Sequence, residues 1–282
     1  MNEKKIALIT DSACDISDEE LEKYNIRVIP LRICFSDRTY RDKTELNSNE
    51  IYNMIKTEIP KSSLPSSEDI EAIFDELASE NVTDVIYVGI SSGLSGSYNF
   101  IKVLGEERKD FNMHAFDTKT LSLGQGMLVI YAAKMLEDGK DIKEIMDGLQ
   151  AVRDKMSAFF VLRTLTYLAK GGRIGKVAGT VGSLLNLCPV ITVNKDGVYE
   201  AAAKTIGYKR VVELMFAEFS KRFSGKNISV SIVHGMEEDA AKLLLNRIKE
   251  VSNVVESRIS SVTAVLGVHT GPGLLGVIAY PI

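Results

Sequence analysis

The segment whose residue types and spacing most clearly suggest catalysis is Gly89-Ile-Ser91-Ser92-Gly93, which matches the pattern GxSxG. In hydrolases this pattern places a nucleophilic serine on a sharp turn between a strand and a helix. Such a serine needs a histidine to accept its proton and donors to stabilise the oxyanion. The chain contains three histidines, and a serine hydrolase that uses Ser91 and His269 is therefore one hypothesis.

The same serines also allow a non-covalent interpretation. Residues 91–97 read Ser-Ser-Gly-Leu-Ser-Gly-Ser and precede an expected helix. The free N–H groups and the positive dipole end of a helix start favour an anion. The hydroxyl of Ser91 or Ser92 would then donate to a carboxylate or phosphate. An ordinary helix start with small residues is the structural alternative.

Other motifs argue against nucleotide, metal and disulfide sites. Residues 271–276 spell GxGxxG, but the helix and acidic ribose ligand of a dinucleotide site do not follow. Residues 170–175 lack the Walker spacing. No Asp, Glu and His cluster has metal-ligand spacing, and Cys14, Cys34 and Cys188 form no CxxC pair. We expect no metal and no cofactor other than a bound ligand.

Composition and charge favour a folded protein that does not bind nucleic acid. Hydrophobic residues make up 45% of the 282 residues and charged residues 26%, close to globular averages. The net charge of −4 offers no electrostatic reason to bind polyanions, so we expect no nucleic-acid partner. The apolar run Ile6–Ile9 is shorter than the hydrophobic region of a signal peptide, which favours a cytoplasmic location.

The order of apolar patterns predicts an α/β fold. The first part of the chain alternates β-branched runs with amphipathic helical patterns, as is typical of parallel strands joined by helices. The expected strands are 6–10, 27–35, 85–90 and 113–116, and the expected helices include 47–58, 123–136 and 142–155.

After the expected strand at 158–162, glycine becomes frequent and a Lys195-Asp196-Gly197 turn predicts a β-hairpin. The later expected elements are helices at 208–223 and 239–251 and strands at 228–233, 254–259, 262–268 and 277–279. We predict two domains: an N-terminal α/β domain at 1–157 with a mostly parallel sheet and flanking helices, and a C-terminal α/β domain at 158–282 with a mixed sheet. His269 would lie at a strand end.

Several motifs together resemble one family. They run nearly from end to end of the chain: Ile9-Thr-Asp-Ser12, Lys61-Ser-Ser-Leu-Pro-Ser66, Ser91-Ser-Gly-Leu-Ser-Gly-Ser-Tyr98, Gly171-Gly-Arg-Ile174 and His269-Thr-Gly-Pro-Gly273. In this combination the chain resembles the DegV family, the fatty-acid-binding proteins that serve as the lipid-carrying subunit of bacterial fatty acid kinase.

The resemblance implies a two-domain α/β fold of the DegV/EDD-like kind, with a long-chain fatty acid in a buried apolar pocket at the domain junction. By analogy, Ser62, Ser91 or Ser92, and His269 would hold its carboxylate. A partner kinase would phosphorylate that carboxylate with ATP, and the acyl phosphate would go to phospholipid synthesis. The chain itself would bind lipid without catalysis and would contact the membrane briefly for lipid exchange.

Two basic residues are candidates for a surface that faces the phosphate or the kinase, namely Arg173 and Lys209. Many relatives carry arginine where Ile206 aligns, which weakens the analogy in this basic segment. A lipid-sensing protein without a kinase partner is therefore a further alternative.

Overall fold

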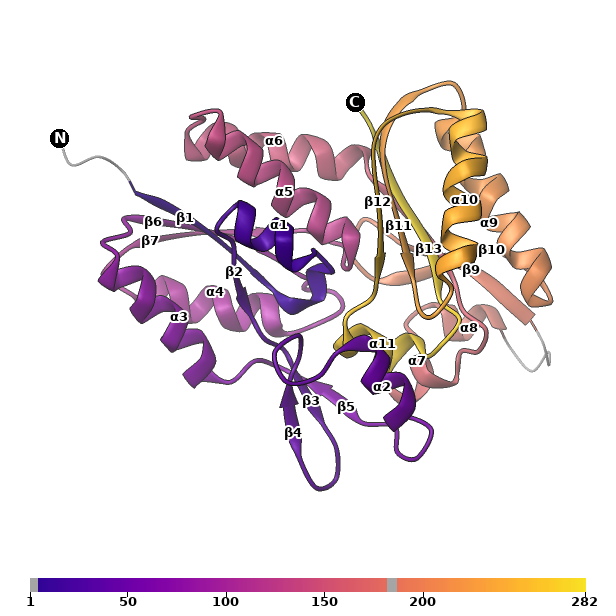
Figure 1. The fold of residues 1–282 in the computed structure, drawn as a ribbon, viewed down its shortest axis with the longest axis horizontal. Coiled ribbons are helices and arrows are strands. Elements are labelled where there is room, and N and C mark those ends of the chain that lie inside the picture. Colours follow the sequence, from indigo (N-terminus) through magenta and orange to yellow (C-terminus); the bar gives the residue numbers. More distant parts are fainter. Residues whose placement is uncertain (1–4, 182–186) are drawn as a thin grey trace.

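The computed structural model describes residues 5–181 and 187–282, and its largest sheets are one parallel and one mixed (Figure 1). The parallel sheet has the strand order β2-β1-β6-β7. Its strands are β1 (Ile6–Asp11), β2 (Arg27–Ile29), β6 (Asp84–Gly89) and β7 (Asn112–Asp117). Every residue of β6 is buried, as expected for a central strand of a parallel sheet with both faces covered.

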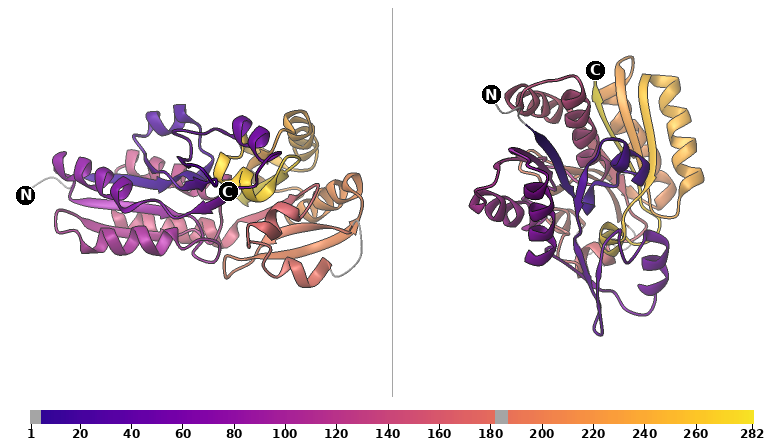
Figure 2. Two further views of the ribbon diagram at one scale, coloured as in Figure 1. Left: turned by 90° about the horizontal axis from the view of Figure 1, so that it is seen from below. Right: turned by 60° about the vertical axis from the view of Figure 1, so that its left-hand side comes forward.

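Alternate residues of β1 face different helices. Ala7 and Ile9 join a core that contains α3 (Ser67–Ser79) and α4 (Ser97–Glu107). Leu8 joins the core that contains α5 (Leu123–Glu137). This period of two is the normal alternation of a strand, and Figure 2 shows helices on both sides of the sheet. Helix α6 (Ile142–Lys155) packs on α5.

The mixed sheet has the strand order β10-β9-β8-β13-β11-β12, in which only β11 and β12 pair in parallel. Its strands are β8 (Ser157–Val161), β9 (Leu187–Val193), β10 (Tyr199–Ile206), β11 (Asn227–His234), β12 (Asn253–Ser261) and β13 (Leu275–Pro281). Helices α9 (Tyr208–Phe223) and α10 (Glu238–Val251) cover one face. Residues such as Phe160 and Ile278 on the other face share a core with α5.

The predicted fold class is confirmed, because a parallel sheet and a mixed sheet are both present with helices on their faces. The predicted hairpin is also confirmed, since β9 and β10 pair antiparallel across the turn at 195–197. The division into domains at residues 157 and 158 stays a prediction. One continuous core contains residues of both sheets.

A small antiparallel sheet and several short helices complete the described part of the chain. The sheet has the order β4-β3-β5, formed by β3 (Arg32–Cys34), β4 (Thr39–Arg41) and β5 (Lys61–Ser63). The short helices are η1 (Ser12–Cys14), α1 (Asp18–Lys23), α2 (Ser48–Met54), α7 (Thr166–Lys170), α8 (Val177–Val181) and α11 (Ala264–Thr270).

The prediction of one strand at 27–35 is wrong, because this segment contributes to two different sheets as β2 and β3. The change of sheet falls at Pro30-Leu31. Pro30 has no N–H to donate to a ladder. The N–H of Leu31 donates instead to Ser12 Oγ at 3.1 Å.

The prediction of a strand at 262–268 is also wrong, since most of this segment belongs to α11. Two buried carboxylates accept hydrogen bonds from the first residues of this segment. Asp15 Oδ1 accepts from the N–H of Thr263 at 2.7 Å, and Asp42 Oδ1 accepts from the N–H of Val265 at 3.1 Å. His269 therefore lies in the last turn of a buried helix and not at a strand end.

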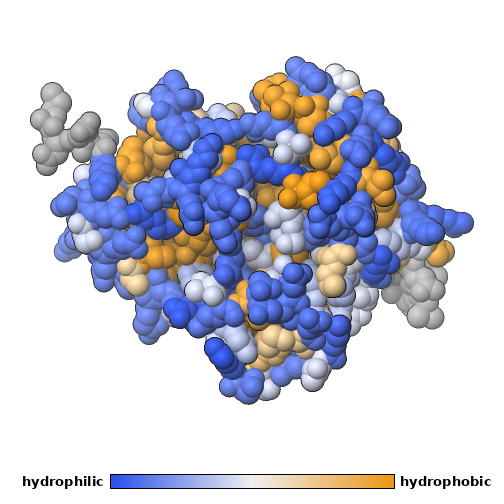
Figure 3. Space-filling view, in the orientation of Figure 1, coloured by the Kyte–Doolittle hydropathy of each residue, from blue (hydrophilic) through white to orange (hydrophobic). Residues whose placement is uncertain are grey.

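In the part of the chain that the structure describes, we find no helix long and apolar enough to span a bilayer. The face shown in Figure 3 is predominantly hydrophilic, with separate hydrophobic areas between the hydrophilic residues.

Candidate ligand-binding site

A mostly apolar cavity of about 90 Å³ lies where the three sheets and α11 come together. Its volume is several times the 10 to 15 Å³ or so that one water molecule needs by the same measure. Apolar residues from all parts of the fold line it: Leu31, Leu64, Ile90, Leu94, Leu121, Phe159, Phe160, Val193, Tyr199, Val233, Val262, Val265, Leu266, Leu274 and Ile278. Such a wall suits an alkyl or aromatic ligand.

A serine and a histidine meet on the cavity wall. Ser62 lies in the middle of β5, where it pairs with Ile33 of β3. Its Oγ is hydrogen-bonded to Nε2 of His269 at 2.7 Å, although 207 residues separate the two in the chain. Both residues line the cavity. The structure therefore brings together two of the residues that the sequence singled out.

His269 is a neutral imidazole at ordinary pH. The residue is 9% exposed, and burial together with the nearby positive charge of Arg173 lowers its pKa to about 4. Within residues 5–181 and 187–282, Nδ1 of this ring has no hydrogen-bond partner. A neutral ring keeps one N–H donor and one acceptor nitrogen.

Arg173 brings a permanent positive charge to the same cavity. One guanidinium nitrogen, Nη1, donates to the carbonyl of Gly171 at 2.8 Å. Gly171 lies directly against the imidazole, since a Cβ at this position would come within 2.1 Å of His269 Nδ1. The absence of a side chain at Gly171 thus allows the segment that carries Arg173 to approach His269. A cation, a hydroxyl and an imidazole together form a site suited to one carboxylate.

Four further polar residues on the cavity wall were not identified from the sequence: Ser63, Ser95, Ser122 and Thr270. Ser95 is the third serine of the segment 91–97, and its Oγ is hydrogen-bonded to Ser97 Oγ at 2.9 Å. The sequence did contain a signal for Ser95, because every serine of that loop was a possible donor. Ser122 and Thr270 carry no comparable pattern.

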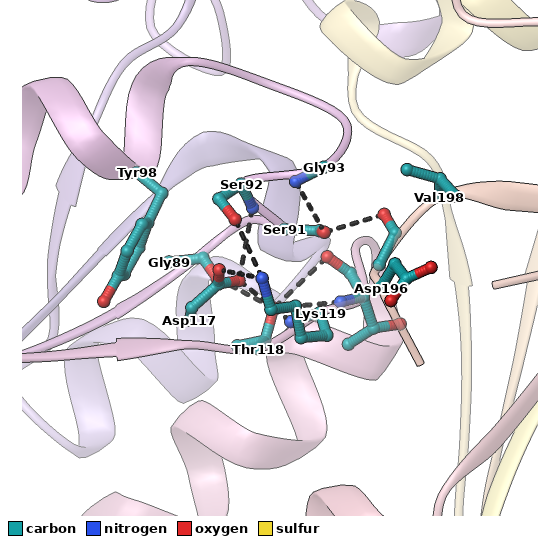
Figure 4. Close-up of polar contacts among 12 residues, drawn as sticks. Gly89, Ser91, Ser92, Gly93, Tyr98, Asp117, Thr118, Lys119, Asp196 and Val198 are labelled. Atoms are coloured by element: carbon teal, nitrogen blue, oxygen red, sulfur yellow. Dashed lines mark hydrogen bonds and ion pairs between the residues drawn. The ribbon is translucent and has the colours of Figure 1, made fainter. Parts of the chain in front are cut away.

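Ser91 and Ser92 are not among the residues that line the cavity. Figure 4 shows the polar contacts that these two serines make. Ser91 is fully buried, and its Oγ donates to the carbonyl of Gly197 at 2.8 Å. Ser92 Oγ accepts from Lys119 Nζ at 2.9 Å, and its N–H donates to Asp117 Oδ1 at 3.2 Å. The structure therefore places these two serines in contacts within the protein, apart from Ser62 and His269.

The remaining basic candidate, Lys209, is exposed in the first turn of α9 and does not line the cavity. Ile206, at the end of β10, is also exposed. Among the described residues, no group of three His, Cys, Asp or Glu side chains could hold a metal ion.

These features define an α/β protein with a mostly apolar cavity and a small polar cluster on the cavity wall. The chain belongs to the DegV family: the family model described as "Uncharacterised protein, DegV family" matches residues 5–281.

Curated relatives match along their full length. The chain is 37% identical to a DegV domain-containing protein of Clostridium acetobutylicum, over 98% of this chain and 99% of that protein. It is 38% identical to a DegV domain-containing protein of Clostridium perfringens, over 97% and 98% respectively.

Solved structures show the same fold. A DegV family protein from Thermus thermophilus, described by its fatty acid binding, superposes with a TM-score of 0.91 at 32% identity, over 99% of this chain and 100% of that one. A stearic acid-binding protein from Eubacterium ventriosum gives a TM-score of 0.88 at 28% identity, over 98% of each chain. DegV from Bacillus subtilis, described as a fatty acid binding protein, gives 0.87 at 28% identity, over 99% and 100%.

Proposed function

We propose that this protein binds a long-chain fatty acid in the cavity, with the carboxylate held by Ser62, His269 and Arg173. The observation that carries this proposal is the hydrogen-bonded Ser62–His269 pair beside Arg173 on an otherwise mostly apolar wall. The solved relatives described as fatty acid binding support it. Ser95 also lines the cavity and would add a further hydroxyl donor.

The apolar wall would supply most of the affinity. Each methylene removed from water contributes about 0.8 kcal/mol, so a chain of about fifteen methylenes contributes roughly 12 kcal/mol before the costs of association. The polar cluster would then fix the orientation of the ligand. A carboxylate beside a guanidinium and hydroxyl groups keeps its charge in a site that otherwise disfavours ions.

We further propose that the protein presents this carboxylate to a partner ATP-dependent kinase and carries the acyl phosphate toward phospholipid synthesis. This step rests on the family resemblance. In this scheme Arg173 and the exposed Lys209 are the cations that would face the phosphate or the kinase. Exchange of the lipid would require brief contact with a membrane surface.

The test is native mass spectrometry of the purified protein, followed by organic extraction and rebinding of defined fatty acids. We expect a mass increase equal to one fatty acid, which extraction removes and palmitate restores. Failure to carry any acyl chain, together with failure to bind added fatty acids, would reject the proposal. Formation of acyl phosphate with ATP and a purified kinase subunit then separates a kinase partner from a lipid sensor.

The geometry does not favour a serine hydrolase. The Ser62–His269 distance of 2.7 Å matches a nucleophile and its base, but in the described part of the chain no acid hydrogen-bonds Nδ1 to orient the ring. With a pKa of about 4, the imidazole is also a weak base. We therefore propose that the protein is not an enzyme. Labelling by a fluorophosphonate probe that is lost in Ser62→Ala or Ser91→Ala would contradict this.

A further inference from the structure

Two segments far apart in the sequence meet beside the cavity. Residues 90–94 belong to the connection between β6 and α4, and residues 194–198 form the turn between β9 and β10 (Figure 4). Ser91 Oγ donates to the carbonyl of Gly197 at 2.8 Å and accepts from the N–H of Gly93 at 3.1 Å. The N–H of Ser91 donates to the carbonyl of Thr120 at 2.8 Å. We call this contact between residues 90–94 and 194–198 the serine joint.

The serine joint requires glycine on both sides. A Cβ on Gly93 would lie 2.8 Å from the carbonyl oxygens of both Asp196 and Gly197. A Cβ on Gly197 would lie 2.0 Å from Ser91 Oγ, and Gly197 also has a φ of +78°, which side chains disfavour. The two backbones therefore approach as closely as their atoms allow, and the hydroxyl of Ser91 fills the remaining space.

Both segments of the serine joint continue directly into the cavity wall. Ile90 and Leu94 of the first segment line the cavity, and so do Val193 and Tyr199, which flank the turn. Two hydrogen bonds stiffen the turn, from Asn194 N to the Val198 carbonyl and from Gly197 N to the Asn194 carbonyl, each at 3.0 Å. Any movement of the turn therefore also moves Val193 and Tyr199, the two residues of the hairpin that line the cavity.

We propose that Ser91 is a positioning residue that locks the β9–β10 hairpin against the loop 90–94 and so limits how often the cavity opens. This inference rests on the proposed fatty acid binding. It gives Ser91 a role without direct contact to the ligand. It also explains why a segment with the GxSxG pattern needs both its serine and Gly93 here: the serine supplies the bond and the glycine permits the approach.

Loss of the serine joint and loss of a direct ligand contact have different effects on the rates of fatty acid association and dissociation. A contact made only in the complex slows dissociation and leaves association nearly unchanged. An opening step that precedes both entry and exit slows both rates. Removing the lock therefore raises the association and dissociation rates together, and the affinity changes less than either rate.

The experiment uses stopped-flow exchange of a fluorescent long-chain fatty acid in the full-length, delipidated protein. The lock variants are Ser91→Ala, Ser91→Cys, which keeps a weak donor, and Gly93→Ala. Gly96→Ala is the matched control, because its Cβ would meet only Leu64 Cδ2, at 3.4 Å. We expect both rates to rise roughly tenfold or more in Ser91→Ala and Gly93→Ala, less in Ser91→Cys, and not in Gly96→Ala. The reason is that losing a buried hydrogen bond changes the equilibrium between the closed and the open cavity by about a factor of ten or more.

Each outcome decides the proposal. Unchanged rates in folded Ser91→Ala or Ser91→Cys overturn it, and a faster dissociation with unchanged association makes Ser91 a ligand contact instead. If Ser91→Ala does not fold, Gly93→Ala and Ser91→Cys give the decision. Failure of the wild-type protein to bind the fatty acid rejects the proposed function. In that case hydrogen exchange of the backbone amides at residues 193–199 still tests the serine joint, and we expect it to be faster in Ser91→Cys than in the wild type.

Discussion

His269 makes the stability of the lipid-free protein depend on pH. Burial and the charge of Arg173 hold the pKa of its ring at about 4 in the folded protein, against about 6.5 in an unfolded chain. Below pH 6.5 the unfolded chain takes up a proton that the folded protein does not. The stability that this histidine contributes is therefore present above pH 6.5 and is lost as the pH falls toward 4. With about 1.4 kcal/mol for each pKa unit, the loss is about 3 kcal/mol.

The measurement compares urea unfolding of the wild-type protein and His269→Gln at pH 7.5 and pH 4. Glutamine keeps hydrogen-bonding capacity toward Ser62 but does not titrate. Burial raises the pKa of Asp11, Asp15 and Asp42, which opposes the histidine, but these carboxyls are present in both proteins and cancel in the difference.

We expect the free energy of unfolding of the wild type, minus that of His269→Gln, to fall by about 3 kcal/mol from pH 7.5 to pH 4. A difference that stays constant within about 0.5 kcal/mol, the usual effect of a surface substitution, would refute a buried neutral imidazole.

Three other predictions concern the same region. Arg173→Met should weaken palmitate binding roughly tenfold to a hundredfold by losing a charged donor, as displacement titration would show, and equal affinity would remove Arg173 from the site. Ser62→Ala should weaken binding while Ser62→Thr, which keeps the hydroxyl, should not; equal losses would exclude the hydroxyl. Burial raises the pKa of Asp42 to about 6, so its stabilising contribution relative to Asp42→Asn should fall by about 2 kcal/mol as the pH rises from 4 to 7. Urea unfolding at the two pH values measures this, and a pH-independent difference would contradict it.

The elements whose patterns are local were predictable from the sequence. The apolar run of β6 and the amphipathic helices α6 and α9 carry their own periodicity, and each lies where the sequence placed it. The hairpin between β9 and β10 was also predictable, because the turn residues Asp196 and Gly197 are typical of such connections.

Helix α11 was not predictable in the same way. Its sequence, Ala-Val-Leu-Gly-Val-His-Thr, is short and rich in β-branched residues, which locally favour a strand. Its first residues are held by Asp15 and Asp42, which lie 248 and 223 residues away from their donors in the chain. No sequence window contains both partners, so tertiary contacts override the local preference.

The site was only partly predictable. The family resemblance singled out Ser62 and His269, and the structure brings them within 2.7 Å. Arg173 was singled out as a basic residue facing a phosphate or a kinase, which stays a prediction, and the residue lines the cavity near the histidine. Which serine of the segment 91–97 faces the cavity depends on how the loop turns, and the serine there is Ser95.

The most direct test of the account is carbon NMR of palmitate labelled at the carboxyl carbon and bound to the protein. If Arg173, Ser62 and His269 surround the carboxylate, the bound signal stays that of an ionised carboxyl from pH 8 to pH 5, because the cation and donors hold its pKa low. In Arg173→Met the same signal should titrate within this range, since burial without the cation raises the pKa. A bound signal that is identical in the wild type, Arg173→Met and Ser62→Ala would contradict the account.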